Sequence, residues 1–352
     1  MFVTQQPHQS GLTQAGLSGT ASKSAVDSAL PLFTEADLAE AAAIVYRHMP
    51  PTPQYNWPLL SKRLGCQVWV KHENHTPTGS FKIRGGLVYH HYLRQEEPEL
   101  KTTMASTRGN HGQSVALAGK LYGFKPTIVV PYGNSPDKNR SMIGWGAELI
   151  KYGHDFEESL AFAKQHAGEC HMHFVPSFHL RLVLGVASYC MEFLKAVPDL
   201  ETVYVPIGKG SGICAMIAAR NALNHRAEIV GVVSTEAQAY KLSFDQGQLV
   251  STDSANTIAD GVACRIPNPV AFEWIHQSVS RIVAVPDDLV LRAIGALYSD
   301  THHLAEGAGA IALAALMTDE EHQRMQGRRV GVVLCGGNLD WSLMERAKAF
   351  ID

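Results

Sequence analysis

The stretch that decides the fold is residues 77–86, which read PTGSFKIRGG and place Lys82 at the start of a predicted helix. Gly79 and Ser80 introduce that helix, and the small residues around the lysine leave room for a ligand. A lysine at a helix N-terminus feels the positive end of the helix dipole, and burial further disfavours its charged form. Its amine is then neutral and able to attack a carbonyl group. An exposed lysine on an ordinary helix is the alternative, because short motifs carry false positives.

The sequence around this stretch alternates between short apolar segments and helical patterns. Thr34 is expected to cap a helix over 36–46, with Asp37 in its first turn. Strands are predicted at 67–71, 103–105, 127–130, 147–150, 173–175, 202–205, 229–233, 281–285 and 330–334. Helices are predicted at 81–93, 114–121, 135–144, 156–165 and 213–224.

Long βα alternation of this kind predicts an α/β fold, in which mostly parallel twisted sheets carry helices on both faces. About ten strands exceed one comfortable open sheet, so we expect two sheets and two subdomains. A chain of 352 residues, of which 45% are hydrophobic and 18% charged, is long enough for two cores.

Composition excludes several classes of function. The 30 basic residues are dispersed and the formal net charge is -3, so no nucleic-acid partner is expected. No segment approaches about 18 uninterrupted apolar residues, so no membrane span is expected. Residues 1–30 are rich in Gln, Ser, Thr, Ala and Gly and lack a secretion signal, so we predict a disordered leader there and a cytoplasmic protein.

The cysteines and histidines give no metal motif. The six cysteines have no C-x-x-C spacing, which argues against a disulfide framework and against a zinc site. His171 and His173 would share one strand face, and His302 and His303 are adjacent, but neither pair has an apparent third ligand. We therefore predict no metal site.

Three loops after predicted strands are candidate ligand sites, because ligands of open α/β sheets bind at the carboxyl ends of strands. Residues 106–112, STRGNHG, leave backbone N–H groups free at a helix start, which suits a carboxylate. Residues 208–212, GKGSG, allow backbone amides to close on a phosphate. Residues 335–338, CGGN, place a thiol where it can face a heteroaromatic ring.

The glycine loop at 208–212 also has a competing interpretation. A strand, a G-x-G-x-G turn, a helix, a second strand and then Glu236 resemble the start of a dinucleotide-binding fold, although the third glycine comes one position early. A Walker-type P-loop does not match, because Lys209 is followed by Gly210 rather than by Ser or Thr. Taken alone, the loop predicts only that an anion binds.

Together these motifs resemble the fold-type II family of pyridoxal-phosphate enzymes, and within it the serine/threonine dehydratases (threonine ammonia-lyases) and serine racemases. The similarity spans residues 31–341. Its signatures occur in order along the chain: PTGSFKIRG at 77–85, GNHG at 109–112, the glycine loop at 208–212, TIADG at 257–261, Glu306, and CGGN at 335–338.

The resemblance implies a tryptophan synthase beta-like fold with a large cofactor-binding domain of residues 31–101 and 180–352, and a small domain of residues 102–179. It implies pyridoxal 5'-phosphate as the cofactor, with Lys82 as the lysine that bonds to its aldehyde as a Schiff base and as the general base. It assigns to the cofactor Phe81, Lys82, Asn110, Gly208, Lys209, Gly210, Ser211, Gly212, Gly261, Glu306 and Cys335. It assigns to the substrate Ser106, Thr107, Arg108 and His111.

The activity implied is the dehydration and deamination of a β-hydroxy amino acid, such as threonine, serine or a hydroxyaspartate, to a 2-oxo acid and ammonia. A homodimer is expected from relatives. Arg108 departs from the family, since racemases and many dehydratases have there a serine that acts as a second base, and arginine stays protonated. A racemase or a β-replacing synthase remains the alternative within the fold. A nucleotide-binding protein that uses the Gly208 loop is the alternative from another class.

Overall fold

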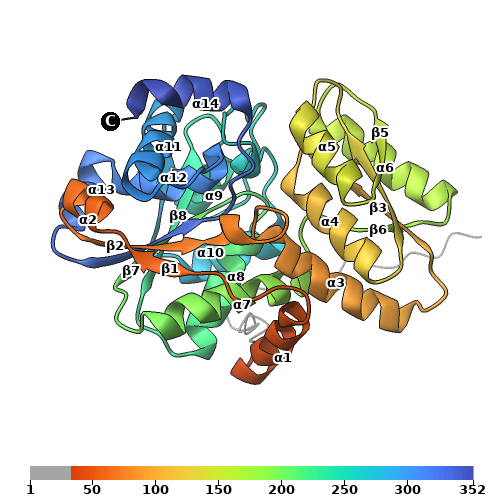
Figure 1. Ribbon diagram of the computed structural model, residues 1–352, viewed down its shortest axis with the longest axis horizontal. Coiled ribbons are helices and arrows are strands. Elements are labelled where there is room, and N and C mark those ends of the chain that lie inside the picture. The colour runs from red at the N-terminus through yellow and green to blue at the C-terminus, as the bar shows by residue number, and fades with distance from the viewer. Residues whose placement is uncertain (1–32, 352) are drawn as a thin grey trace, which may run out of the picture. The chain divides into compact units, whose positions relative to one another are not determined.

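The computed structural model describes residues 33–351, and its strands form two sheets (Figure 1). The six-stranded sheet has the order β1 (Gln54–Asn56), β2 (Gln67–His72), β10 (Arg329–Leu334), β7 (Thr202–Pro206), β8 (Glu228–Ser234) and β9 (Arg281–Val285). The four-stranded sheet has the order β5 (Glu148–Lys151), β4 (Lys125–Val130), β3 (Thr102–Ser106) and β6 (His173–Phe174). All neighbouring strands are parallel except β1 and β2.

The predicted α/β fold with two sheets is confirmed, and each predicted strand is present. The strand that the sequence did not predict is β1, whose three residues Gln-Tyr-Asn show no apolar pattern. It pairs antiparallel with β2 at the edge of the sheet, with Tyr55 opposite Val70. The partner strand, rather than its own composition, therefore makes this segment a strand.

Helices pack around both sheets. They are α1 (Glu35–Tyr46), α2 (Pro58–Leu64), α3 (Lys82–Glu96), α4 (Asn110–Leu121), α5 (Pro136–Gly144), α6 (Phe156–Glu169), α7 (Leu180–Ala196), α8 (Ser211–Ala222), α9 (Ala239–Gln246), α10 (Pro269–Ser278), α11 (Asp287–Thr301), α12 (Gly307–Leu316), α13 (Asp319–Arg324) and α14 (Trp341–Ala347). Short 3-10 turns are η1 (Glu73–His75), η2 (Asp260–Val262) and η3 (Lys348–Phe350). The predicted capping box of α1 is present, since the Asp37 amide donates to Thr34 Oγ1 and the Thr34 amide donates to the Asp37 carboxylate.

The core of the six-stranded sheet lies between α12 and α8. Every residue of α12 is buried, because its sequence GAGAIALAAL carries only small and apolar side chains that pack on β7, β8, β9 and β10. Figure 1 shows α12 and α11 on one side of this sheet and α8 and α7 on the other. Helices on both faces explain why each of the central strands β7, β8 and β10 is buried at all but one of its residues.

Helix α7 was not predicted from the sequence, and it fixes the helix that begins at Lys82. A Cβ on Gly185 would lie 2.4 Å from the backbone oxygen of Arg84, so the small residue allows α7 to cross α3 closely. Arg84, which is fully buried, donates to Glu73 at 2.7 Å and to Glu192 of α7 at 2.7 Å. These charge-assisted hydrogen bonds join α3 to α7 and to η1.

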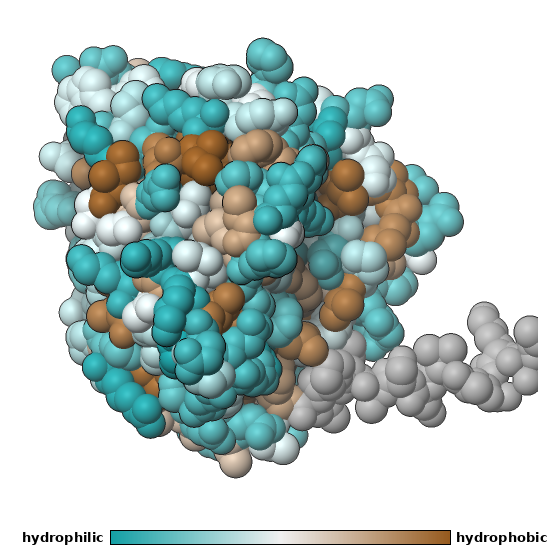
Figure 2. Space-filling model, turned by 90° about the vertical axis from the view of Figure 1, so that its right-hand side faces the viewer, coloured by the Kyte–Doolittle hydropathy of each residue, from teal (hydrophilic) through white to brown (hydrophobic). Residues whose placement is uncertain are grey.

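The side of the molecule that carries the four-stranded sheet has a mixed surface. Figure 2 shows hydrophilic residues interleaved with apolar ones on this side. Tyr132, Ile143 and Tyr152 are among the exposed large apolar side chains of this part of the chain. Scattered exposed apolar residues are ordinary for a folded protein and define no binding surface by themselves.

Two predictions about chain organisation remain predictions. The disordered leader, residues 1–30, lies outside the described residues. The strands of the four-stranded sheet lie between Thr102 and Phe174, but the division into a large and a small domain with the predicted boundaries is not tested by this arrangement. No helix within residues 33–351 is both long and apolar enough to span a membrane.

Candidate active site

The predicted site residues converge on two adjoining hollows at the carboxyl ends of the strands. Lys82 follows β2, the loop 106–109 follows β3, the loop 207–210 follows β7, and Cys335 follows β10. Parallel strands bring these four loops to the same edges of the sheets, where ligands of open α/β folds bind. Both hollows are lined by Lys82, Asn110, Gly208, Lys209, Gly261 and Glu306.

The smaller hollow contains every residue that the resemblance assigns to the cofactor. Its lining comprises Phe81, Lys82, Asn110, Tyr189, Val205, Pro206, Gly208, Lys209, Gly210, Ser211, Gly212, Gly261, Val262, Glu306, Ala308 and Cys335. Tyr189 was missed by sequence reasoning, because it lies on α7 and reaches the site only through the packing of that helix. Its ring meets the Phe81 ring edge-on, with 6.1 Å between ring centroids.

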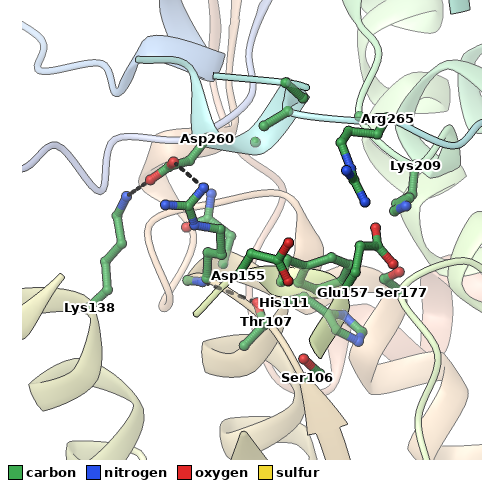
Figure 3. A pocket seen from close by; sticks show the side chains of 18 of the residues that line it. Ser106, Thr107, His111, Lys138, Asp155, Glu157, Ser177, Lys209, Asp260 and Arg265 are labelled. Atoms are coloured by element: carbon green, nitrogen blue, oxygen red, sulfur yellow. Dashed lines mark hydrogen bonds and ion pairs between the residues drawn. The ribbon is translucent and has the colours of Figure 1, made fainter. Parts of the chain in front are cut away.

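The larger hollow has a volume of about 340 Å³ and contains every residue that the resemblance assigns to the substrate. Ser106, Thr107, Arg108 and His111 lie on its wall. Charged residues that the sequence did not single out also line it: Lys138, Asp155, Glu157, Asp253, Asp260 and Arg265. In Figure 3, Arg265 and Lys209 lie on the side of the cavity where Glu157 and Ser177 are also found.

Lys82 is a half-buried lysine that lines both hollows. Burial lowers the pKa of its amine, and the nearby Cys335 and Glu306 oppose that shift only in part. Its Nζ lies 4.8 Å from the centre of the Phe81 ring, and its backbone oxygen accepts a hydrogen bond of 2.7 Å from Ser114. A buried amine with a lowered pKa is a better nucleophile and base than an exposed one, as the sequence predicts for this residue.

The glycine loop presents backbone amides to the smaller hollow. Gly210 caps α8 with φ of 105°, a left-handed conformation that glycine adopts without strain. The first N–H groups of α8 have no intrahelical acceptor, and they lie at the positive end of the helix dipole. A Cβ on Gly208 would lie 2.1 Å from the Gly261 backbone oxygen, so the loop approaches the TIADG segment this closely because residue 208 is glycine. This geometry suits an anion such as a phosphate group.

A hydrogen-bonded chain of polar side chains crosses the floor of the site. The Asn110 amide donates to Glu306 and its oxygen accepts a hydrogen bond of 2.7 Å from Asn338. Burial raises the pKa of Glu306, although Lys138 and Asn110 oppose the shift. The Cys335 thiol donates to the Ala308 oxygen at 3.2 Å, and burial raises its pKa, so the thiol stays neutral.

His111 and Thr107 lie on the wall of the larger hollow. Burial, together with the charge of Lys82, lowers the pKa of His111 to about 3, so its imidazole is neutral at physiological pH. Thr107 Oγ1 accepts a hydrogen bond of 3.1 Å from the Gly109 amide, which holds the loop closed on itself. Neutral donors at the start of α4 suit a carboxylate ligand.

Arg108 lies at the mouth of the larger hollow. Its side chain is 48% exposed, and its guanidinium lies 3.6 Å from Asp260. Lys138, whose side chain is 9% exposed, contacts the same carboxylate at 3.1 Å (Figure 3). The ion pair with Asp260 is the alternative to the predicted contact between Arg108 and a substrate.

Residues 45–336 match a family model described as "Pyridoxal-phosphate dependent enzyme", so the chain belongs to this family. Among its relatives is an L-threonine ammonia-lyase of Thermotoga maritima, 30% identical over 90% of this chain and 78% of the relative. An L-threonine ammonia-lyase of Geobacter sulfurreducens is 34% identical over 80% of this chain and 69% of the relative. The solved structure of maize serine racemase superposes with a TM-score of 0.83 at 25% identity, covering 90% of this chain and 97% of the racemase. The predicted family is therefore confirmed.

The residues present fit pyridoxal 5'-phosphate, the cofactor of this family. The smaller hollow combines a lysine whose pKa burial lowers, an aromatic ring beside it, and a glycine loop at a helix N-terminus. When bound, the cofactor supplies a covalent attachment for an amino group and an electron sink for the carbon next to it. The Cys335 thiol also lines this hollow and stays neutral.

Proposed function

We propose that the chain is a pyridoxal-phosphate-dependent lyase that removes water and then ammonia from a β-hydroxy amino acid such as threonine, serine or a hydroxyaspartate. The products are a 2-oxo acid and ammonia. The observation that carries this proposal is that Lys82, half-buried and with a lowered pKa, opens into the same cavity as the loop from Ser106 to His111. The names of the two ammonia-lyases among its relatives support the choice of reaction.

Each part of the site has a role in this proposal. Lys82 holds the cofactor and then serves as the base that takes the α-proton, because burial lowers the pKa of its amine and so favours the neutral form. Ser106, Thr107 and His111, with the amides at the start of α4, bind the substrate carboxylate. The amides of the Gly208 loop hold the cofactor phosphate, and Phe81 and Asn110 position its ring.

The choice of lyase over racemase rests on the opposite face of the substrate. Racemisation needs a second base there, and Arg108 occupies the position at which racemases carry a serine. A guanidinium stays protonated throughout the physiological range and does not accept that proton. The large cavity also admits substrates with a charged β-substituent, since Arg108, Lys138 and Arg265 line it.

We further propose that the enzyme is a cytoplasmic homodimer. The six cysteine thiols are all free, which fits a reducing compartment. Light scattering after gel filtration measures the mass directly: a dimer has twice the 38.3 kDa of one chain. A mass of one chain, or of four, would reject the dimer.

The experiment that tests the reaction is a panel of amino acids assayed for release of 2-oxo acid and ammonia by the cofactor-loaded protein. The panel contains L- and D-threonine, L- and D-serine, and both hydroxyaspartate diastereomers, with alanine as the substrate without a leaving group. The proposal predicts stoichiometric oxo acid and ammonia from at least one β-hydroxy amino acid and none from alanine. Accumulation of the D-enantiomer with rapid uptake of solvent deuterium, and no oxo acid, would establish the racemase instead.

A further inference from the structure

Three histidines from two distant segments meet beside the loop that leads to Lys82. His72 ends β2, His75 ends η1, and His303 lies between α11 and α12. One ring nitrogen of each histidine lies within 4.8 Å of the other two. The ring centroids are 4.5 Å apart for His72 and His303, and 4.9 Å apart for His75 and His303. This cluster lies outside the hollows described above, none of whose lining residues belongs to it.

Hydrogen bonds show which nitrogen of two of these rings carries a lone pair. His303 Nδ1 lies 2.7 Å from the Thr301 carbonyl oxygen, which can only accept, so Nδ1 carries the proton and Nε2 the lone pair. His72 Nε2 lies 3.0 Å from the Trp57 indole nitrogen, which can only donate, so this Nε2 also carries a lone pair. His303, whose Nδ1–H is held by a carbonyl, therefore has the arrangement found in metal-ligating histidines, whereas the Trp57 indole occupies the lone pair of His72.

A second observation concerns the enclosed ring of the cluster. The His72 side chain is fully buried, and its ring has Trp57 and Asn74 as hydrogen-bond partners. His72 therefore has to release the Trp57 indole before its Nε2 lone pair can bind an ion.

We infer that His72, His75 and His303 form a binding site for a divalent transition metal ion of the zinc class. Three neutral imidazoles are the ligand set of many tetrahedral zinc sites, with the fourth position left to water or another small ligand. Ligand nitrogens around such an ion lie about 3.4 Å apart, as bonds of about 2.0–2.1 Å require, so binding draws the three rings together. His75 is exposed, which gives the ion a route of entry.

A metal ion at this cluster would hold together the two chain segments that lead to Lys82 and to Glu306. His303 lies three residues before Glu306, and His75 lies seven residues before Lys82. The two segments also approach each other at Gly337, where an added Cβ would lie 3.0 Å from Asn74 Cβ and 3.0 Å from the Leu304 oxygen. The ion therefore pins together the loops that carry Lys82 and Glu306. It is a structural site, and the inference does not depend on the reaction proposed above.

The test is equilibrium dialysis of the cofactor-loaded, chelator-treated protein against Zn²⁺, with the bound metal counted by mass spectrometry. The wild-type chain is expected to bind one Zn²⁺ more tightly than His75→Ala, whose dissociation constant rises at least ~10-fold because one of three ligands is lost. His303→Ala is expected to behave in the same way. His75 is exposed, so its replacement leaves the fold intact, and unchanged cofactor absorbance and circular dichroism verify this.

A matched control disrupts a histidine–cysteine pair that lies elsewhere on the surface. The Cys170 sulfur lies 3.6 Å from His166 Nε2 on α6, and Cys170→Ser eliminates this pair without touching the cluster. The inference predicts that Cys170→Ser binds Zn²⁺ as the wild type does. It is overturned if His75→Ala retains wild-type zinc affinity, if Cys170→Ser loses the bound zinc, or if the wild type binds no zinc.

Trp57 provides a second readout that does not depend on counting metal. Its indole must leave His72 Nε2 before the ion can bind there, and its ring lies 5.5 Å from the His303 ring. Ni²⁺, a quenching ion that also prefers imidazole, should quench tryptophan fluorescence in the wild type and not in Trp57→Phe. Equal quenching in both proteins would place the ion elsewhere.

Discussion

Two lysines that line the larger hollow, Lys82 and Lys138, differ in their surroundings. Burial lowers the pKa of Lys82, which forms no ion pair with any residue in 33–351. Burial would also lower the pKa of Lys138, but Glu306, Asp260 and Asp340 outweigh it and raise that pKa. Lys82 is therefore the one of these two whose amine is poised to react.

Replacing Lys82 tests this distinction. Lys82→Ala, and equally Lys82→Arg, should reduce turnover at least ~1000-fold, because both remove the amine that holds the cofactor and moves the α-proton. Any cofactor that remains should lose its violet absorbance. Lys209→Ala serves as the control and should keep that absorbance. A Lys82→Ala protein with full absorbance and activity would reject the assignment.

Arg108 has two possible partners, and one substitution separates them. If its guanidinium binds an acidic β-substituent, Arg108→Ala should lower kcat/KM for hydroxyaspartate ~10-fold or more while threonine is little affected. If it binds the α-carboxylate, kcat/KM should fall by a similar factor for both substrates. Unchanged values for both would mean that the ion pair with Asp260 is its whole role.

At the scale of single elements, the start of α8 should be sensitive to one methyl group. A Cβ on Gly210 would lie 2.4 Å from the Ala271 Cβ at a backbone φ of 105°, so both the clash and the strain oppose it. Gly210→Ala should weaken cofactor binding ~10-fold or more and lower stability by about 1–3 kcal/mol, as measured by cofactor titration and urea unfolding.

Gly133→Ala is the matched control for this change. Gly133 has φ of 76°, and an added Cβ there would have no atom within 4 Å. The Gly133→Ala variant carries the same backbone strain without the clash. It should therefore lower the free energy of unfolding by about 1 kcal/mol and leave cofactor affinity unchanged. If both variants bind the cofactor equally well, the phosphate does not lie at the Gly208 loop.

The buried charges that join α3 to α7 should govern stability in acid. Burial alone would raise the pKa of Glu192, but the charges of Arg84 and Lys71 outweigh it and hold the pKa below its ordinary value. A carboxyl group with a lowered folded-state pKa adds stability above its unfolded pKa of about 4.3, and this contribution fades as pH falls through the folded value.

Glu192→Gln should therefore lower the free energy of unfolding by about 3–5 kcal/mol near pH 7, because it leaves buried Arg84 and Lys71 with one fewer carboxylate. The difference from the wild type should shrink toward pH 3, where the wild-type carboxyl is protonated. Chemical denaturation across this pH range measures it. A difference that grows toward low pH would contradict the assigned sign.

Elements with a strong local pattern were predictable, and those that depend on distant partners were not. The apolar strands, the capping box at Thr34 and the glycine loop can each be recognised from a few consecutive residues. By contrast, β1 exists because β2 lies beside it. Helix α7 was missed although Arg181, Glu192 and Lys195 recur at helical spacing in its otherwise apolar sequence. Asp155, Glu157 and Arg265 reach the cavity from loops and helix ends whose sequences resemble ordinary surface segments. The family resemblance, rather than periodicity, supplied the site residues that the structure brings together.

At the scale of the whole molecule, ion pairs bridge the mouth of the cavity. Arg108, after β3, and Lys138, on α5, belong to the part of the chain that forms the four-stranded sheet. Asp260 and Asp340, their partners, follow strands of the six-stranded sheet. Ion pairs therefore connect the two parts of the fold at the mouth of the cavity.

Asp260→Asn should loosen this connection without unfolding the protein. Asp260 is about a third exposed, and exposed pairs contribute about 0–1 kcal/mol each, so the melting temperature should change little. KM should change by up to ~5-fold, and the difference from the wild type should shrink as salt is raised, because salt screens partly exposed charges. A salt-independent loss of kcat alone would instead place Asp260 in the chemistry.

The most direct test of the central claim locates the cofactor on the chain. Borohydride reduction of the cofactor-loaded protein, followed by proteolysis and mass spectrometry, marks the lysine to which the cofactor is bonded. The account predicts the pyridoxyl mass on the peptide that contains Lys82 and on no other lysine peptide. A label on Lys138 or Lys209, or an unlabelled protein that still releases 2-oxo acid from hydroxy amino acids, would contradict it.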